Sequence, residues 1–155
     1  MIKLVRLDYR LLHGQVVFSW TQNIGATRII IVDDEAANDE FKKTALNLSK
    51  PTGVRLNIFT LEKTLEKMPK IEKLEDNIMM IFGNTKTLAS FCKNYPKIKT
   101  INYGGMANKP GAKQYAAAIF LDAAEQADTK EILGQGISIY MQQTPGHKKE
   151  NLTDL

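Results

Sequence analysis

Short apolar runs alternate with helix-like patterns along most of the chain. Seven apolar runs predict β-strands, at residues 2–7, 28–32, 54–59, 77–82, 98–103, 115–121 and 136–142. Between several of them apolar residues recur at helical spacing, as Val16, Trp20 and Ile24 do, and this predicts amphipathic helices. The predicted helices cover residues 14–24, 36–50 and 123–133, with two more that Pro69 and Pro96 are expected to end.

Strand–helix alternation at this spacing is typical of βαβ units and predicts an α/β fold. We expect a doubly wound, mainly parallel β-sheet of about seven strands with helices on both faces. Runs such as Ile29–Val32 and Met79–Phe82 are apolar without alternation, which is typical of strands covered on both faces. The length of 155 residues predicts a single domain over residues 1–155, with a polar C-terminal tail at 144–155.

Apolar side chains at helical spacing also predict parts of the core. Phe41, Ala45 and Leu48 mark one face of the helix at 36–50, which Pro51 and the following residues end. Cys92 lies on an apolar helical stripe and is expected in the core. Because it is the only cysteine, the chain can form no intrachain disulfide. The absence of disulfides is typical of proteins in a reducing cytosol.

Charge narrows the classes of partner. The chain has 21 Lys and Arg against 17 Asp and Glu, a net charge of +4. This mild excess suits an anionic ligand, but it is too small to indicate a nucleic-acid-binding protein. Apolar runs are too short for a membrane span and no signal-peptide pattern is present, so we expect a cytoplasmic protein.

Functional residues are expected where strands end, because open α/β sheets bind ligands beyond the carboxyl ends of their strands. The first such segment holds the most chemistry. In an extended segment Arg6, Asp8 and Arg10 share one face. His13 follows, just before Gly14 opens a helix whose N-terminus presents free N–H groups. Arginines, an imidazole and a helix start together predict a phosphate site.

A histidine in this setting can act as a nucleophile toward phosphorus. Arg6, Arg10 and the amides from Gly14 onward would stabilise the transferred charge. Asp8 would hold an arginine in place or orient the imidazole. The same spacing also fits a histidine that only caps or packs and arginines in ordinary ion pairs. A non-catalytic module that binds a phosphorylated metabolite or a regulatory partner is therefore the alternative.

Other strand ends offer supporting roles. Asp33 or Asp34 would cap the next helix or orient an arginine of the site, and Asp34 is the candidate for orientation. The loop from Gly104 and Gly105 to Gly111 would lend amides to phosphate, act as a mobile flap, or merely connect two strands. His147 in the polar tail is expected to be solvated, which leaves His13 as the catalytic candidate.

The chain resembles the IIB components of the mannose/fructose/sorbose family of the bacterial sugar phosphotransferase system. The resemblance rests on the run Arg6–Val16 with its Leu-x-His-Gly-Gln-Val ending, and on Trp20, Ile30–Asp34, Ala36, Asp39, Pro51, Gly53, Val54, Asn102, Gly104–Met106, Gln142 and Pro145. These pieces cover nearly the whole chain in order. One departure is Tyr9, where the family often has a second aspartate.

The resemblance implies a phosphotransferase relay. A phosphohistidine on a IIA component would donate to His13, which would then donate to a sugar held by the membrane components IIC and IID. It implies a mainly parallel α/β sheet, self-association, and a peripheral place at the inner face of the cell membrane. No metal or nucleotide cofactor is required, because phosphohistidine is already an activated donor. The sequence does not specify the sugar.

Overall fold

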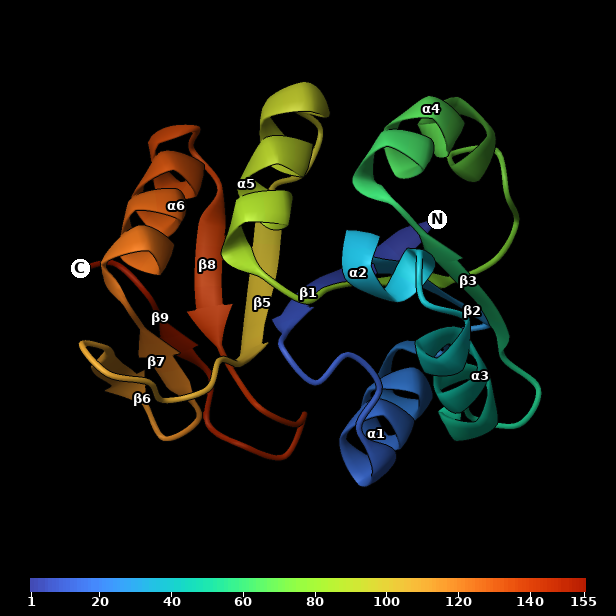
Figure 1. The fold of residues 1–155 in the computed structure, drawn as a ribbon, viewed down its shortest axis with the longest axis horizontal. Helices are drawn as coiled ribbons and strands as arrows, with labels where there is room; N and C mark the ends of the chain where they lie inside the picture. The colour runs from blue at the N-terminus through green and yellow to red at the C-terminus, as the bar shows by residue number, and fades with distance from the viewer.

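The computed structural model describes all 155 residues and contains a seven-stranded sheet beside a two-stranded one (Figure 1). The order in the large sheet is β3 (Arg55–Phe59), β2 (Arg28–Val32), β4 (Ile78–Phe82), β1 (Ile2–Asp8), β5 (Thr100–Gly105), β8 (Ser138–Met141) and β9 (Glu150–Asn151). Only the pairing of β8 with β9 is antiparallel. The predicted α/β class with a mainly parallel sheet is confirmed.

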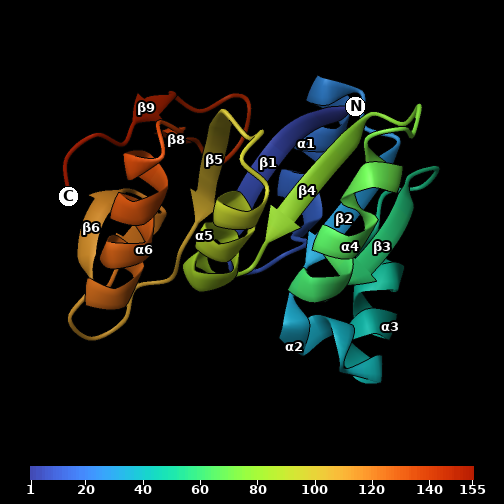
Figure 2. The same cartoon turned by 90° about the horizontal axis from the view of Figure 1, so that it is seen from above.

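Helices cover both faces of this sheet. They are α1 (Gly14–Ile24), α2 (Asp34–Ala37), α3 (Glu40–Ser49), α4 (Leu61–Ile71), α5 (Thr85–Asn94) and α6 (Ala123–Gly134). Successive residues of β2 belong to two different core clusters, as expected of a strand buried on both sides. The larger cluster takes side chains from α4, α5 and α6, and the smaller takes them from α1. Figure 2 shows α4 and α5 in front of the strands and α1 behind them.

Side-chain caps set where most helices begin. Five of the six N-cap residues accept a hydrogen bond from a backbone N–H of the following turn: Asp33, Asp39, Thr60, Asn84 and Asp122. The exception is His13, which precedes α1 and makes no side-chain cap bond. Its ring is therefore not used to begin the helix.

The predicted helix at 36–50 is wrong as a single element. It is two helices, α2 and α3, because the Asp39 carboxylate accepts hydrogen bonds from the N–H groups of Phe41 and Lys42 and starts a new helix there. The stripe that predicted the helix does not face the core. Phe41 and Leu48 are each 83% exposed, while Leu46 packs against the sheet.

Pro69 does not end its helix, contrary to the prediction. It lies inside α4, which continues to Ile71. Proline removes one helical hydrogen bond, and here it does so in the last turn. The N–H of Glu72 still bonds the carbonyl of Met68, so the turn is completed.

The predicted strand at 115–121 is instead a hairpin. Strand β6 (Lys113–Ala116) pairs antiparallel with β7 (Ile119–Leu121) and forms the small second sheet. No glycine or proline marks the turn between them, so the apolar run looks continuous in the sequence. The hairpin stays close to β5, because the N–H of Met106 bonds the carbonyl of Ala118 at 2.9 Å.

The C-terminal segment, predicted to be a polar tail, is partly built into the fold. Strand β9 supplies the seventh strand of the large sheet, and the Leu152 side chain is 2% exposed. Leu152 also donates its N–H to the carbonyl of Ile139. Residues 142–149 therefore form a closed connection between β8 and β9, beside the carboxyl end of β5.

Candidate active site

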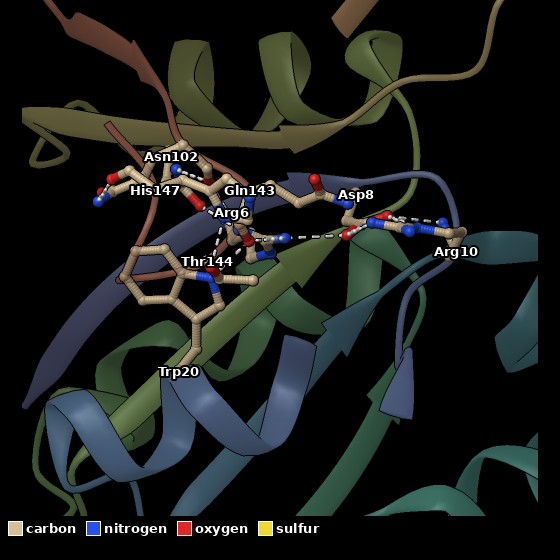
Figure 3. A network of polar contacts seen from close by, with 9 residues as sticks. Arg6, Asp8, Arg10, Trp20, Asn102, Gln143, Thr144 and His147 are labelled. Carbon is tan, nitrogen blue, oxygen red and sulfur yellow. Dashed lines mark hydrogen bonds and ion pairs between the residues drawn. The ribbon is translucent and has the colours of Figure 1, made fainter. Parts of the chain in front are cut away.

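The first strand ends in a buried group of charges. The Asp8 carboxylate is 1% exposed and accepts from both arginines: from Arg6 Nη2 at 3.0 Å, and from Arg10 Nε and Nη2 at 3.0 Å each (Figure 3). The backbone N–H of Arg10 adds a fourth bond at 3.0 Å. The sequence placed these three residues together, and the structure joins them through Asp8.

Arg6 uses its donors inside the protein. Its Nη1 donates to Asn102 Oδ1 at 2.5 Å and to the carbonyl of Gln142 at 3.2 Å, and its Nη2 also donates to the carbonyl of Gln143 at 3.0 Å. Burial lowers the pKa of Arg6, and the Asp8 carboxylate acts against that effect. Because the side chain is 1% exposed, Arg6 is placed to anchor Asp8 and residues 142–143 rather than to touch a phosphate, and the predicted electrostatic stabilisation by its charge stays a prediction.

Gly104 and Gly105 belong to strand β5 and not to the loop that follows it. Both are buried in β5, where the absence of a side chain leaves room for the arginines. A Cβ at Gly104 would lie 2.0 Å from Arg6 Cζ, and one at Gly105 would lie 3.0 Å from both Arg10 Nη2 and Asp8 Oδ1. The two glycines allow this close approach, and the roles considered for the loop that leads from them to Gly111 stay predictions.

Arg10 remains available to a ligand. Its side chain is 21% exposed, and the Nε–Nη2 edge that binds Asp8 leaves Nη1 without a hydrogen-bond partner in the protein. The hydrogen bond to Asp8 raises the pKa of Arg10. A guanidinium held along one edge by a carboxylate presents its other edge in a fixed direction, which suits recognition of a phosphoryl oxygen.

His13 is exposed and lies at the N-terminus of α1. The chain reaches it through a turn in which Leu11 adopts φ = 62° and donates its N–H to the carbonyl of Asp8. The N–H groups of Gly14 and Gln15 bond no acceptor in the protein, so they face outward with the positive end of the helix. Asp8 makes no bond to His13, so its geometry supports holding the arginines rather than orienting the imidazole.

The acidic pair Asp33–Asp34 forms no hydrogen bond with Arg6, Asp8 or Arg10. Asp33 Oδ2 accepts from the N–H of Ala36 at 3.0 Å and caps α2. The expectation that one of these aspartates caps the next helix is therefore confirmed. Asp34 Oδ1 accepts from the N–H of Leu61 at 2.8 Å and so ties α2 to the start of α4. Asp34 bonds no arginine, and the structure does not support the orienting role predicted for it.

The C-terminal connection joins the site in a way that spacing did not reveal. Trp20 Nε1 donates to the carbonyl of Gln143 at 2.9 Å, and the Arg6 guanidinium lies 5.5 Å from the Trp20 ring (Figure 3). Asn102 Nδ2 donates to the carbonyl of Gln142 at 3.0 Å. The available signal was the polar residue Asn102 between Ile101 and Tyr103, near the end of a predicted strand. His147 is exposed, as predicted, and contacts Thr144.

No cluster of three or more His, Cys, Asp or Glu side chains is arranged to hold a metal ion. None of the helices has both the length and the apolar character needed to cross a bilayer.

Comparison with known proteins points to one family. The family described as "PTS system sorbose subfamily IIB component" matches residues 2–155. The chain is 32% identical over 154 residues to the N-acetylgalactosamine-specific phosphotransferase enzyme IIB component 1 of Escherichia coli, covering 99% of this chain and 97% of that relative. The crystal structure of an N-acetylgalactosamine-specific IIB component 1 from Escherichia coli is similar, with a TM-score of 0.91 at 30% identity, covering 99% of this chain and 100% of that one.

A longer relative also matches. The PTS system mannose-specific EIIAB component of Escherichia coli is 30% identical over 155 residues. The match covers 100% of this chain and 48% of that protein. The similarity to all of these relatives therefore extends along the whole chain.

Proposed function

This chain belongs to the sorbose subfamily of IIB components of the phosphotransferase system (PTS), and from that premise we propose that His13 carries a phosphoryl group from a donor protein to a sugar. PTS IIB components are phosphotransferases, so the chain takes part in phosphoryl transfer during sugar uptake. The residue and the two half-reactions are the proposed part.

The arrangement of Arg10 and His13 carries the proposal. An exposed imidazole precedes a helix of 11 residues with free N–H groups, three positions after an arginine whose Nη1 is unbonded. A phosphoryl group adds nearly two negative charges. A fixed guanidinium and a helix N-terminus are the two protein features that best stabilise such charge as it develops.

In the first half-reaction the N–P bond of the donor phosphohistidine breaks as a ring nitrogen of His13 bonds to phosphorus. The other ring nitrogen of His13 loses its proton to solvent, and the donor imidazole gains one. Arg10 and the N–H groups of Gly14 and Gln15 stabilise the three phosphoryl oxygens during transfer. The donor is a IIA component, and the mannose-specific EIIAB relative, named for both parts, supports this partnership.

In the second half-reaction the N–P bond at His13 breaks and a sugar hydroxyl oxygen bonds to phosphorus. The hydroxyl proton goes to the ring nitrogen that phosphorus leaves. We assign the sugar to a complex with the membrane components IIC and IID, which would bring the chain to the inner face of the membrane. The arginine that stabilised the incoming phosphoryl group serves the outgoing one as well.

Phosphorylation of the protein tests this proposal. The wild-type chain, incubated with a phosphorylated IIA component, should gain one acid-labile, base-stable phosphate on His13 in a mass spectrum. His13→Ala should gain none, whereas His147→Ala, which alters the exposed histidine of the C-terminal connection, should be phosphorylated normally. Phosphate on the His13→Ala chain would rule out the assignment. Tight reversible binding of a sugar phosphate without phosphohistidine would instead support the binding module.

A further inference from the structure

A cavity of about 170 Å³ lies beside Arg10, and the transfer steps above leave it unused. Tyr9 and Arg10 form one wall, Met106 and Asn108 continue from the end of β5, and Phe120 comes from the β6–β7 hairpin. The hairpin lies outside the large sheet, so it is an addition to the parallel fold placed next to the site.

Hydrogen bonds fix each wall of this cavity. The N–H of Tyr9 bonds the carbonyl of Gly105 at 3.0 Å, and Phe120 donates its N–H to the carbonyl of Met106 at 3.1 Å. The loop that carries Asn108 is held by Lys109, whose Nζ bonds Glu125 at 2.7 Å and the carbonyl of Ala107 at 3.0 Å. The cavity is therefore already formed in the free protein, as small-molecule sites usually are.

The lining combines aromatic surface with a few hydrogen-bonding groups. Tyr9 is 49% exposed, and Phe120 and Met106 add apolar surface. Arg10 and Asn108 supply the polar groups, and no carboxylate lines the cavity. Aromatic rings pack against the C–H face of a sugar ring, while guanidinium and amide groups bond its hydroxyls.

Resting on the function proposed above, we propose that this cavity is a subsite for the acceptor, one monosaccharide ring. Its volume of about 170 Å³ lies below the ~300–1,000 Å³ of pockets that bury drug-sized ligands, so it suits a small ligand. His13 follows Arg10 by three positions, so their Cα atoms are at most ~11 Å apart. A ring in the cavity would lie against Arg10, the residue that holds the phosphoryl group in the function proposed above.

This placement assigns specificity to residues of this chain as well as to the membrane components. Arg10 serves both parts of the site, because it lines the cavity and faces the phosphoryl group. Asn108 and Phe120 line the cavity and have no part in the proposed loading step, whereas the Tyr9 ring lies 5.7 Å from the Arg10 guanidinium. Changing Asn108 or Phe120 should therefore alter which sugar is phosphorylated and leave loading of His13 unchanged.

The test measures the two half-reactions separately for Asn108→Ala and Phe120→Ala. Asn47→Ala and Phe41→Ala, both exposed on α3, are the matched controls. The acceptors are D-mannose, D-fructose, L-sorbose and N-acetyl-D-galactosamine, supplied with membranes that contain IIC and IID. We expect kcat/KM to fall at least fivefold for the preferred sugar and by unequal factors among the four. Loading of His13 should stay within twofold of wild type, and the controls should match wild type in both steps.

Three results would overturn the subsite. Unchanged transfer to every sugar removes the cavity from the reaction. An equal loss for all four sugars makes it a docking surface for a membrane component, and slower loading of His13 makes it one for the donor. Asn108 lies in an exposed loop, so Asn108→Ala still tests the subsite if Phe120→Ala folds poorly. A wild-type chain that never carries phosphate on His13 contradicts the proposed function itself, which is a separate outcome.

Discussion

The guanidinium of Arg6 occupies the space that a side chain at Gly104 would need. A Cβ on Gly104 would lie 2.0 Å from Arg6 Cζ and 2.2 Å from both terminal nitrogens. Arg6 is itself held by Asp8, Asn102 and two backbone carbonyls, so it has no nearby alternative position. The packing of the charged group at the end of β1 therefore requires a glycine at position 104.

Gly104→Ala should displace Arg6 and separate it from Asp8. Breaking a buried ion pair in this way costs about 3 kcal/mol or more. Urea unfolding should show this loss in the free energy of unfolding. Arg10 should also lose its fixed position, because Asp8 holds both arginines, and loading of His13 should slow at least fivefold.

Gly134→Ala is the matched control for that substitution. Gly134 ends α6, and a Cβ there meets no atom within 4 Å. Alanine in a helix is favoured over glycine by up to about 1 kcal/mol, so stability should be unchanged or slightly higher. Equal stability of the Gly104→Ala and Gly134→Ala chains would contradict the contact between Arg6 and Gly104.

Local patterns in the sequence were enough to predict the strands that build the sheet. Unbroken apolar runs such as Ile29–Val32 occur where both faces are covered, and the structure buries these four residues completely. The grouping of Arg6, Asp8 and Arg10 was also predictable, because residues two apart in an extended segment share a face. In each case the residues that form the predictive pattern are close in sequence.

Features that depend on contacts between distant residues were not predictable from spacing. Arg6 meets the carbonyls of residues 142 and 143, more than 130 positions away, and this contact buries it and removes it from any phosphate. The hairpin at 113–121 escaped detection because its turn, Ala117–Ala118, lacks the usual turn residues. Phe41 and Leu48 have the spacing of a core stripe, yet they face solvent.

Arg10→Lys should slow loading of His13 at least tenfold. Lysine cannot bind Asp8 along one edge and present a second edge to phosphate, because its ammonium is a single point of charge. Single-turnover phosphorylation by the IIA component measures the rate. Stability should fall as well, because the buried Asp8 carboxylate loses at least one of its two hydrogen bonds from the Arg10 side chain, so the rate is measured on protein shown to be folded.

Arg55→Lys provides the comparison, because Arg55 is an exposed arginine on the edge strand β3. Its rate should equal that of the wild type. If Arg10→Lys also loads at the wild-type rate, Arg10 does not contact the phosphoryl group.

Cys92 should resist thiol reagents in the folded protein. It is fully buried, and burial raises the pKa of its thiol to about 12, so the reactive thiolate is nearly absent at pH 8. Modification by iodoacetamide at pH 8 should be at least about 10³-fold slower than in urea, because it requires opening of the fold. A rate within tenfold of the unfolded chain would mean that α5 does not hold Cys92 in the core.

Asp76→Asn should make stability less dependent on pH under acidic conditions. Asp76 accepts from Arg28 Nε at 3.1 Å and from Thr27 Oγ1 at 3.0 Å, and the hydrogen bond from Arg28 lowers the pKa of this carboxyl below its ordinary 3.8. A carboxyl with a lowered folded-state pKa adds stability that is fully present above its ordinary pKa. That contribution is lost as the pH falls through the folded value. The melting temperature of Asp76→Asn should therefore lie below that of the wild type at pH 7, and the gap should narrow below about pH 4.

Asp154→Asn, at an exposed carboxylate near the C-terminus, should follow the wild type at every pH. A gap that stays constant from pH 7 to pH 3 would show that the ion pair with Arg28 does not contribute to stability.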